Sequence, residues 1–199
     1  MATQGNVHFF TIWAKERLDE MDAAVTSLEG KLAEVQAEAR DKAGKALAEL
    51  RKHRDDFRSH MKAQVATNEA ALVKSKTKLE ADWHSFEAEV KKYVESFGKK
   101  IEQQQATFRV QADAQLKAWR EAADQLGTDA RKFADERRGD VDAAIKRMNA
   151  DAAEAEAKLR KLNEAGTESW SALMAALSET RGAFDRANQA AHEAFKRVA

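Results

Sequence analysis

The residues whose spacing best suits chemistry are histidines and carboxylates. Glu49, His53, Asp56 and His60 follow one another at intervals of four, three and four residues, so a helix would place them on one strip of its surface. Histidine and carboxylate side chains are the ligands of zinc and of di-iron pairs inside helical bundles. This strip is therefore the best candidate in the sequence for a metal site.

A second strip repeats the first three positions as Glu80, His84 and Glu87. At 100° per residue, His53 lies to one side of its neighbouring apolar stripe, whereas His84 lies to the opposite side of its own. Strips displaced in opposite senses do not meet across an antiparallel pair of helices. We therefore predict no metal site and interpret both strips as solvated flanks with pairing between residues four apart. The metal candidates that the spacing offers are His53, Asp56, His60 and His84.

Other catalytic signatures are missing from the sequence. It contains no glycine-rich phosphate loop, no GxSxG and no HExxH. Because it has no cysteine, thiolate metal sites and cysteine nucleophiles are excluded. We predict a protein that is not an enzyme and uses no cofactor.

The composition predicts long helices. The 199 residues include no proline, and charged residues make up 34% of them. Much of the 43% that is apolar is alanine, the best helix former, so large apolar side chains suit a narrow stripe better than a thick core. This mixture is typical of coiled coils and long helices, and it predicts an all-α fold.

Charge and hydropathy limit the partners. The 34 basic and 34 acidic residues give a net charge of zero, so no overall field favours nucleic acid. The longest apolar cluster, residues 7–14, is too short to span a bilayer and lacks the features of a signal peptide. We expect a cytoplasmic protein with no transmembrane segment and no nucleic-acid partner.

Aromatic residues recur at every eleventh position in the middle of the chain, at Phe86, Phe97, Phe108 and Trp119. An eleven-residue repeat closes three helical turns, so this aromatic stripe hardly drifts around a helix. It predicts one nearly straight helix over residues 69–126. The stripe either packs in a core or adsorbs reversibly to a lipid or polymer surface.

Heptad spacing upstream predicts a first helix of matching length, over about residues 7–65. The apolar phase loosens at residues 66–69, where Thr67 and Asn68 suit a turn. We expect a long antiparallel hairpin, a rod on the order of 85 Å, in which the numbers of paired residues sum to about twice 68. Without this turn the first helix would continue uninterrupted.

Glycine–threonine corners follow at Leu126–Asp129 and Ala165–Glu168. Glycine suits the residue after a helix, and threonine suits the N-cap of the next one. We therefore predict two shorter helices after the long hairpin. The expected parts are the long hairpin over residues 1–126 and a C-terminal hairpin over residues 127–199, packed on it in one elongated domain.

The stretch from Lys158 to Phe195 combines a Leu- and Lys-rich helix, a small-residue corner and a Trp-led amphipathic helix. The residues that carry this cadence are Leu159, Leu162, Gly166, Trp170, Leu173, Leu177, Phe184 and Phe195. It resembles the C-terminal half of small bacterial stress-response coiled-coil proteins, and the resemblance implies an all-helical, non-enzymatic stress role. A vaguer similarity is to apolipoproteins and granule-coating phasins, which also use amphipathic helices.

Two groups of residues are candidates for interaction. The stretch from residue 51 to residue 78 has eight basic residues against three acidic ones, a net charge of +5. A turn near residue 68 would make it a basic tip that docks on acidic or phosphate-bearing surfaces, or an ordinary solvated loop region. The basic residues are Arg51, Lys52, Arg54, Arg58, Lys62, Lys74, Lys76 and Lys78. Phe9, Phe10 and Trp13 suit either a lipid surface or the end of a bundle.

These observations favour a non-enzymatic coiled-coil scaffold that acts through protein partners or self-association, with a stress-related role implied by the resemblance. An amphipathic coat protein, which opens onto a lipid or polymer surface, is the first alternative. A metal-binding helical bundle is the second.

Overall fold

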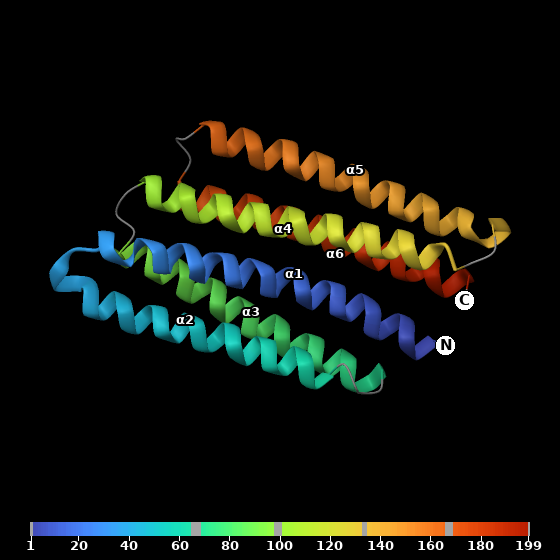
Figure 1. Cartoon of the computed structure of the whole chain (residues 1–199), viewed down its shortest axis with the longest axis horizontal. Coiled ribbons are helices and arrows are strands. Elements are labelled where there is room, and N and C mark those ends of the chain that lie inside the picture. The colour runs from blue at the N-terminus through green and yellow to red at the C-terminus, as the bar shows by residue number, and fades with distance from the viewer. Residues whose placement is uncertain (1, 65–68, 98–100, 133–134, 166–168, 199) are drawn as a thin grey trace.

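The computed structural model of the chain describes residues 2–64, 69–97, 101–132, 135–165 and 169–198. These ranges contain six α-helices of 28 to 31 residues and no strand, which confirms the all-α prediction. The helices are α1 (Ala2–Lys31), α2 (Ala37–Gln64), α3 (Glu69–Phe97), α4 (Ile101–Ala130), α5 (Asp135–Ala165) and α6 (Trp170–Val198). Successive helices run in alternating directions along one common axis (Figure 1).

The six helices form two halves of three helices each. In the first half α1, α2 and α3 pack against one another, and in the second half α4, α5 and α6 do the same. The halves meet where α1 packs against α4 and α6. Figure 1 shows α1 and α4 in the middle of the molecule, with α2 and α5 on its opposite sides.

The predicted first helix over residues 7–65 is wrong, because α1 ends at Lys31. A 3₁₀ turn follows, and Val35 then takes an extended backbone with φ −70° and ψ 139°. The guanidinium of Arg40 donates hydrogen bonds to the carbonyl oxygens of Ala33 and Val35, at 3.1 and 3.2 Å. It therefore satisfies backbone groups that the broken helix leaves open. Each helix is about 45 Å long at 1.5 Å per residue, so the rod of 85 Å does not form.

The predicted helix over residues 69–126 is interrupted as well. The α3 helix ends at Phe97 and α4 begins at Ile101, while residues 98–100 lie outside the described residues. The boundary between the two halves therefore falls here and not at residue 126. The aromatic stripe is divided, with Phe86 and Phe97 in the first half and Phe108 and Trp119 in the second.

The corner predicted at Leu126–Asp129 is also wrong, because α4 continues to Ala130. The hydroxyl of Thr128 donates to the carbonyl oxygen of Asp124 at 3.0 Å inside this helix, so it does not cap the next one. The predicted parts 1–126 and 127–199 therefore do not coincide with structural units.

The second predicted corner is close to the observed one. The α5 helix ends at Ala165, and residues 166–168 lie outside the described residues. Ser169 caps the next helix, because its hydroxyl oxygen accepts a hydrogen bond from the backbone N–H of Ala172 at 3.3 Å. The residues predicted to turn at 66–69 lie outside the described part up to residue 68, and α3 begins at Glu69.

The antiparallel register predicted for the hairpin is nevertheless present. Between α4 and the 3₁₀ turn that follows α1, Gln103 donates to Glu34 at 2.9 Å, and the two residue numbers sum to 137. Between α2 and α3, Lys78 lies 3.1 Å from His60, and these numbers sum to 138. Each arm of the predicted hairpin is thus broken into two helices. The antiparallel pairing is kept by the pair α2–α3, next to the predicted turn, and by the pair α1–α4, farther from it.

One apolar core runs through both halves. Leu50, Phe57 and Phe86 are fully buried in the first half. In the second half the ring of Trp119 packs edge-on against Phe184, with centroids 5.3 Å apart. Among the side chains that the structure describes, no Leu, Ile, Val, Met, Phe, Trp or Tyr is exposed. The large apolar side chains therefore pack against other helices of the same chain.

Candidate functional site

Polar side chains line the face of α4 that packs against α1. Gln103, Thr107, Gln111 and Gln115 recur at every fourth residue, which places them on one face of the helix. All four are buried, with exposures of 9%, 1%, 3% and 0%. Phe108, Leu116 and Trp119 of α4 lie toward α5 and α6 instead. We call the row of polar contacts between α1 and α4 the polar seam.

The polar seam runs along most of both helices. Its contacts are ion pairs and hydrogen bonds between side chains, at distances from 2.8 to 3.5 Å. In order along α1 the pairs are His8–Asp129, Lys15–Glu121, Glu20–Gln115, Ser27–Thr107 and Glu34–Gln103. Glu20, Gln103, Thr107 and Gln115 are buried, and buried polar groups need such partners, so their pairs fix which residues face each other, whereas Lys15 and Glu121 pair at the exposed edge.

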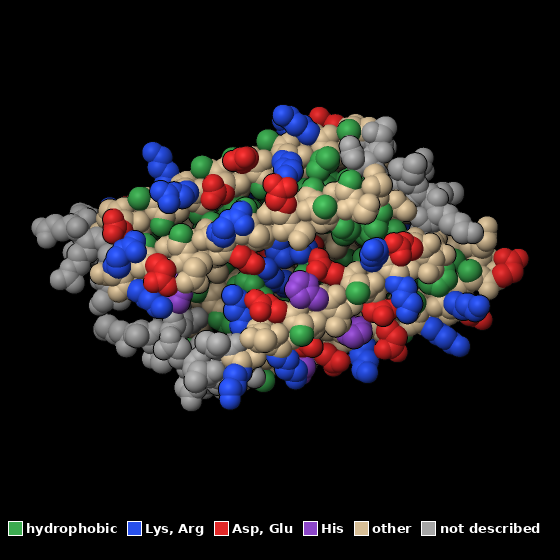
Figure 2. Space-filling view, turned by 180° about the vertical axis from the view of Figure 1, so that it is seen from behind, with side chains coloured by type: hydrophobic (Ala, Val, Ile, Leu, Met, Phe, Trp, Pro, Cys, Tyr) green, Lys and Arg blue, Asp and Glu red, His purple; other side chains and the backbone are tan. Residues whose placement is uncertain are grey.

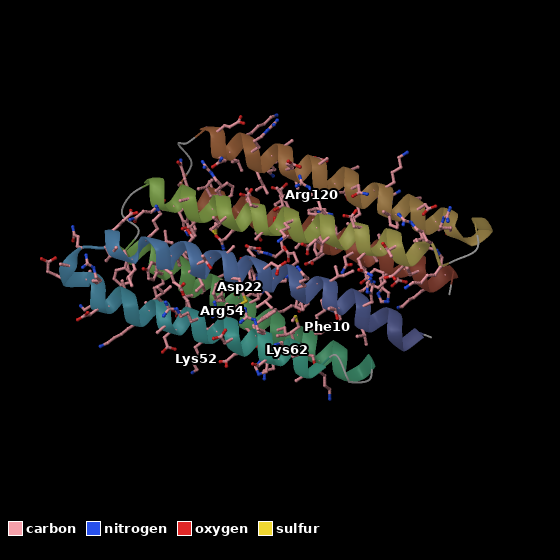
Figure 3. The ribbon with its side chains drawn as sticks, in the orientation of Figure 1. Phe10, Asp22, Lys52, Arg54, Lys62 and Arg120 are labelled. Atoms are coloured by element: carbon pink, nitrogen blue, oxygen red, sulfur yellow. The ribbon has the colours of Figure 1, made fainter. Side chains whose placement is uncertain are left out.

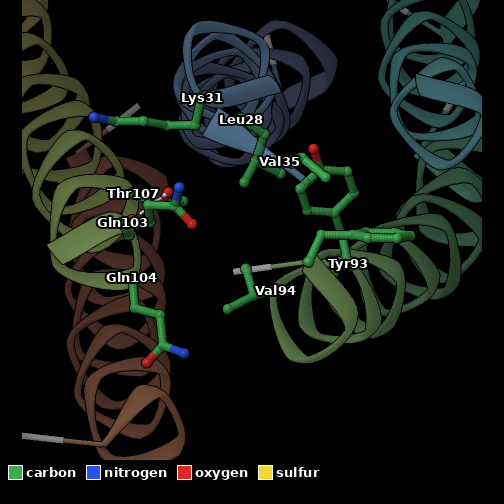
Figure 4. A pocket seen from close by; sticks show the side chains of 9 residues that line it. Leu28, Lys31, Val35, Tyr93, Val94, Gln103, Gln104 and Thr107 are labelled. Carbon is green, nitrogen blue, oxygen red and sulfur yellow. Dashed lines mark hydrogen bonds between the residues drawn. The ribbon is translucent and has the colours of Figure 1, made fainter. Parts of the chain in front are cut away.

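The seam ends at a small cavity where α1, α3 and α4 converge (Figure 4). Its volume is ≈ 10 Å³, about the space of one water molecule. Tyr93 lies at this cavity, and burial raises the pKa of its phenol. The cavity is too small for an organic ligand.

An ionic cluster joins the seam to α3 and α6. Arg181 donates to both carboxylate oxygens of Glu20, at 2.7 and 3.3 Å, and to Glu87 at 2.9 Å. Its guanidinium carbon lies 4.5 Å from the ring centroid of Trp83, a favourable cation–π distance. Burial opposes the charge of Arg181, but its carboxylate neighbours raise its pKa. One arginine therefore connects three helices from both halves.

A second arginine lies beside the first in this cluster. Arg17 donates two parallel hydrogen bonds to Asp185 of α6, at 2.9 and 2.6 Å, and one to Glu16 at 2.7 Å. Its guanidinium carbon lies 4.8 Å from the ring centroid of Trp13. We define the ionic cluster by its six members, Glu16, Arg17, Glu20, Glu87, Arg181 and Asp185.

The ionic cluster holds four carboxyl groups against two guanidinium groups. Glu16 is fully buried, and within the described residues one of its oxygens has no hydrogen-bond partner. Burial raises the pKa of Glu16 to about 7, against the attraction of Arg17. Burial also raises the pKa of Glu20, with the attraction of Arg181 opposing it. The chemistry that this arrangement supports is uptake and release of a proton.

The sequence did not reveal this cluster. The heptad pattern of α1 marks one apolar stripe and leaves Glu16, Arg17 and Glu20 on its polar side. The polar side is buried because α1 packs against α2, α3, α4 and α6. Thr180 and Arg181, between the apolar residues of α6, were the available signal, since a buried face rarely carries charge without a partner.

The metal candidates are not brought together. His60 lies 3.1 Å from Asp82 and 3.1 Å from Lys78, which is a cation and not a ligand. The side chain of His84 is 74% exposed and contacts Glu87 of its own helix. His53 is half-buried and Asp56 is exposed on α2. Among the described residues, no three His, Cys, Asp or Glu side chains could hold a metal ion.

The basic residues of α2 and α3 are largely paired. Arg54 and Arg58 contact Asp22 of α1, at 3.4 and 2.8 Å, and Figure 3 shows Asp22 and Arg54 between α1 and α2. Among the others, Arg51 pairs with Glu29, Lys76 with Glu80, and Lys78 contacts His60. In the described part of the chain Lys52, Lys62 and Lys74 are exposed and form no ion pair. The α1 helix therefore supplies the acidic partners that the sequence estimate of +5 left out.

The aromatic residues near the N-terminus lie in the core. Phe9, Phe10 and Trp13 have exposures of 4%, 7% and 3%. The ring of Phe9 stacks on His192 at 4.7 Å and meets Phe195 edge-on at 5.5 Å. Phe9 joins α1 to α6 at one end of the bundle, Lys76 of α3 lies over the ring of Trp13, and the three residues present no exposed lipid-binding cluster.

The outer surface carries charges of both signs. Figure 2 shows basic and acidic side chains interspersed over one face of the molecule. The larger surface depressions, such as one of ≈ 350 Å³ between α4 and α5, have walls of both charges and include Arg109, Asp113 and Glu156. No described helix has an apolar stretch of the length needed to cross a bilayer.

Comparisons of the chain with protein-family models, curated proteins and solved structures find no match.

Proposed function

We propose that the protein is a non-enzymatic amphipathic helical bundle that opens and binds a lipid surface through the apolar faces of its helices. One observation carries this proposal: none of the described large apolar side chains is exposed, in a chain whose halves meet through polar contacts as well as through a shared apolar core. In the closed bundle, the apolar helix faces that would contact lipid are therefore buried against one another.

The energetics of the two kinds of contact support opening. Apolar burial stabilises by about 25 cal/mol per Å², so the apolar side chains around Phe57 and Phe86, and those around Trp119 and Phe184, stabilise the halves as parts of one core. Buried ion pairs such as Glu20–Arg181 add little net stability, because desolvation offsets their attraction. The polar pairs at the junction between the halves therefore add less net free energy than the apolar burial around them.

The charge balance indicates the kind of lipid. The net charge is zero, and both signs border the helices, so no field attracts the chain to anionic headgroups. Binding to a zwitterionic phosphatidylcholine surface would then depend on apolar burial, and added salt would weaken it little.

Quenching of a buried tryptophan tests the proposal. Trp119 is fully buried, so acyl chains reach it only after the bundle opens. A variant with Trp13, Trp83 and Trp170 changed to Phe keeps it as the single emitter. Small vesicles of brominated phosphatidylcholine should quench its fluorescence, whereas vesicles of the unbrominated lipid should not. Unchanged fluorescence, with the protein remaining in solution on flotation, would exclude the lipid function.

A scaffold that stays closed is the second candidate. It is favoured by the unpaired, exposed Lys52 and Lys62, which Figure 3 shows on the outer side of α2. A closed scaffold would bind an acidic protein surface in a salt-sensitive manner. Retention on immobilised polyglutamate, lost in Lys52→Glu/Lys62→Glu/Lys74→Glu, together with no lipid quenching, would favour it. The stress-related role implied by the resemblance stays a prediction in either case.

A further inference from the structure

We infer that a proton at Glu16 controls the junction between the two halves: the halves stay together while the ionic cluster holds this proton and separate along the polar seam when it is lost. The inference rests on the proposed function for its purpose, but the opening it describes is a property of the free protein.

The geometry singles out Glu16 among the four carboxyl groups. Each arginine is shared between a buried glutamate and an acid at the edge of the cluster, where Glu87 and Asp185 are partly exposed. Glu20 receives two hydrogen bonds from Arg181, whereas Glu16 receives one from Arg17, which also binds Asp185. Glu16 is thus the buried carboxyl with the least neutralisation. A charge there is costly as long as the halves are closed.

The surroundings of Glu16 offer little further positive charge. Within α1 it faces Arg17 and Glu20, and α6 contributes Arg181 and Asp185. The α4 helix contributes Gln115, which donates to the neighbouring Glu20 and does not titrate. On α3, Glu87 accepts a hydrogen bond from Arg181, and Lys76 lies over the ring of Trp13. On α2, His60 contacts Asp82 and Lys78.

The direction of the effect follows from the pKa of Glu16. It is about 7 in the closed bundle and returns toward 4.5 when Glu16 reaches water. The closed state therefore binds the proton more tightly, and rising pH favours the open state. Between pH 6 and pH 8 the equilibrium constant for opening should rise about tenfold. Burial lowers the pKa of His8, so His8 acts in the opposite direction, below its ordinary value of 6.5.

The reactivity of a cysteine placed in the seam measures this opening without lipid. The chain has no cysteine, and Thr107 is 1% exposed, so Thr107→Cys reacts with a maleimide only when the seam opens. Dividing its rate by that of exposed Thr26→Cys removes the pH dependence of the thiol itself. Ala155 is a buried residue of α5, so Ala155→Cys reports on unfolding of the second half.

We expect the normalised rate of Thr107→Cys to rise about tenfold from pH 6 to pH 8, while that of Ala155→Cys stays constant. In Glu16→Gln the rise should become much smaller, because glutamine keeps the shape of the protonated acid and does not titrate, and the rise that remains comes from Glu20, whose pKa burial also raises. The same comparison cancels the contribution of His8. Circular dichroism checks that the variant is folded, and Glu16→Met serves as a second uncharged variant.

An equal rise in both uncharged variants would overturn the inference, and so would a parallel rise of Ala155→Cys, which would indicate global unfolding. Failure of this test leaves lipid quenching of Trp119 unaffected. The opposite result, a rise that depends on Glu16 without any lipid quenching, would overturn the proposed function and leave the inference in place.

Discussion

The α2–α3 pair and the α1–α4 pair are two parts of one hairpin register, yet they are held by different contacts. Leu50 and Phe57 of α2 and Leu79 and Phe86 of α3 are all fully buried apolar residues. The matching face between α1 and α4 is lined by glutamines, threonine, serine and ionised groups. The same antiparallel arrangement is therefore stabilised by apolar burial at one end and specified by polar pairing at the other.

This difference assigns separate roles to the two kinds of contact. Apolar side chains tolerate shifts between neighbours of similar size, whereas the polar pairs of the seam are satisfied in one register. Polar pairing thus selects which faces meet but adds little net free energy. A bundle built this way has a junction whose register is specified by polar pairs, within a core that both halves share.

The largest effect is expected in the apolar part of this comparison. Phe86→Asp places a charge in the core of the first half and should prevent folding or cost more than about 4 kcal/mol. Glu95→Gln, at an exposed position of the same helix, should change the free energy of unfolding by less than about 0.5 kcal/mol. Urea denaturation of both variants measures the contrast. Small, equal effects would contradict a buried apolar core.

In the ionic cluster, removing one charged partner should lower the free energy of unfolding far more than removing Arg181, Glu20 and Glu87 together. Arg181→Met leaves Glu20 and Glu87 without their cation and should destabilise the protein by about 3–5 kcal/mol. The triple variant Glu20→Leu/Glu87→Leu/Arg181→Met should be neutral or more stable by about 1–4 kcal/mol. If the triple variant lost as much as the single one, the ionic cluster would be a main source of stability.

Glu16→Gln should stabilise the protein in a pH-dependent way. The pKa of Glu16 is raised by folding, from 4.5 to about 7, so its contribution to stability falls as pH rises through this interval. At pH 8 the variant should be more stable than the parent protein by on the order of 1–3 kcal/mol. Near pH 4.5 the difference should vanish. Urea midpoints at both pH values provide the measurement, and a constant difference would refute the assignment.

The smallest effect on the free energy of unfolding is expected for an ion pair on the outer surface. Lys158 of α5 and Glu179 of α6 form an ion pair with exposures of 41% and 68%. Lys158→Ala should cost less than about 1 kcal/mol, and 1 M salt should remove the difference between variant and parent. A cost comparable to that of Arg181→Met would mean that burial does not distinguish the two pairs.

The sequence predicted the helical class and the register but not the two breaks that fold the hairpin. Periodicity identifies which residues share a face, and this information is local. The end of α1 at Lys31 depends on Arg40 reaching back to two carbonyl oxygens and on α2 packing against α1, neither of which periodicity encodes.

The ionic cluster could not be predicted from the sequence for a related reason. Glu16 and Glu20 look like solvated residues beside an apolar stripe, because a heptad pattern assumes one buried face. The central position of α1 among four helices buries its second face. Of the predicted interaction residues, Lys52 and Lys62 are exposed as expected, whereas Trp13 is a core residue.

A disulfide across the polar seam tests most directly whether the bundle opens between its halves to bind lipid. The hydroxyl oxygens of Ser27 and Thr107 lie 3.1 Å apart, and the chain has no cysteine of its own. Ser27→Cys/Thr107→Cys, with Trp119 as the single tryptophan, therefore places one reversible bond between α1 and α4. In the oxidised form, brominated phosphatidylcholine should no longer quench Trp119, and reduction with dithiothreitol should restore the quenching. Equal quenching of the oxidised and reduced forms would contradict opening along the seam.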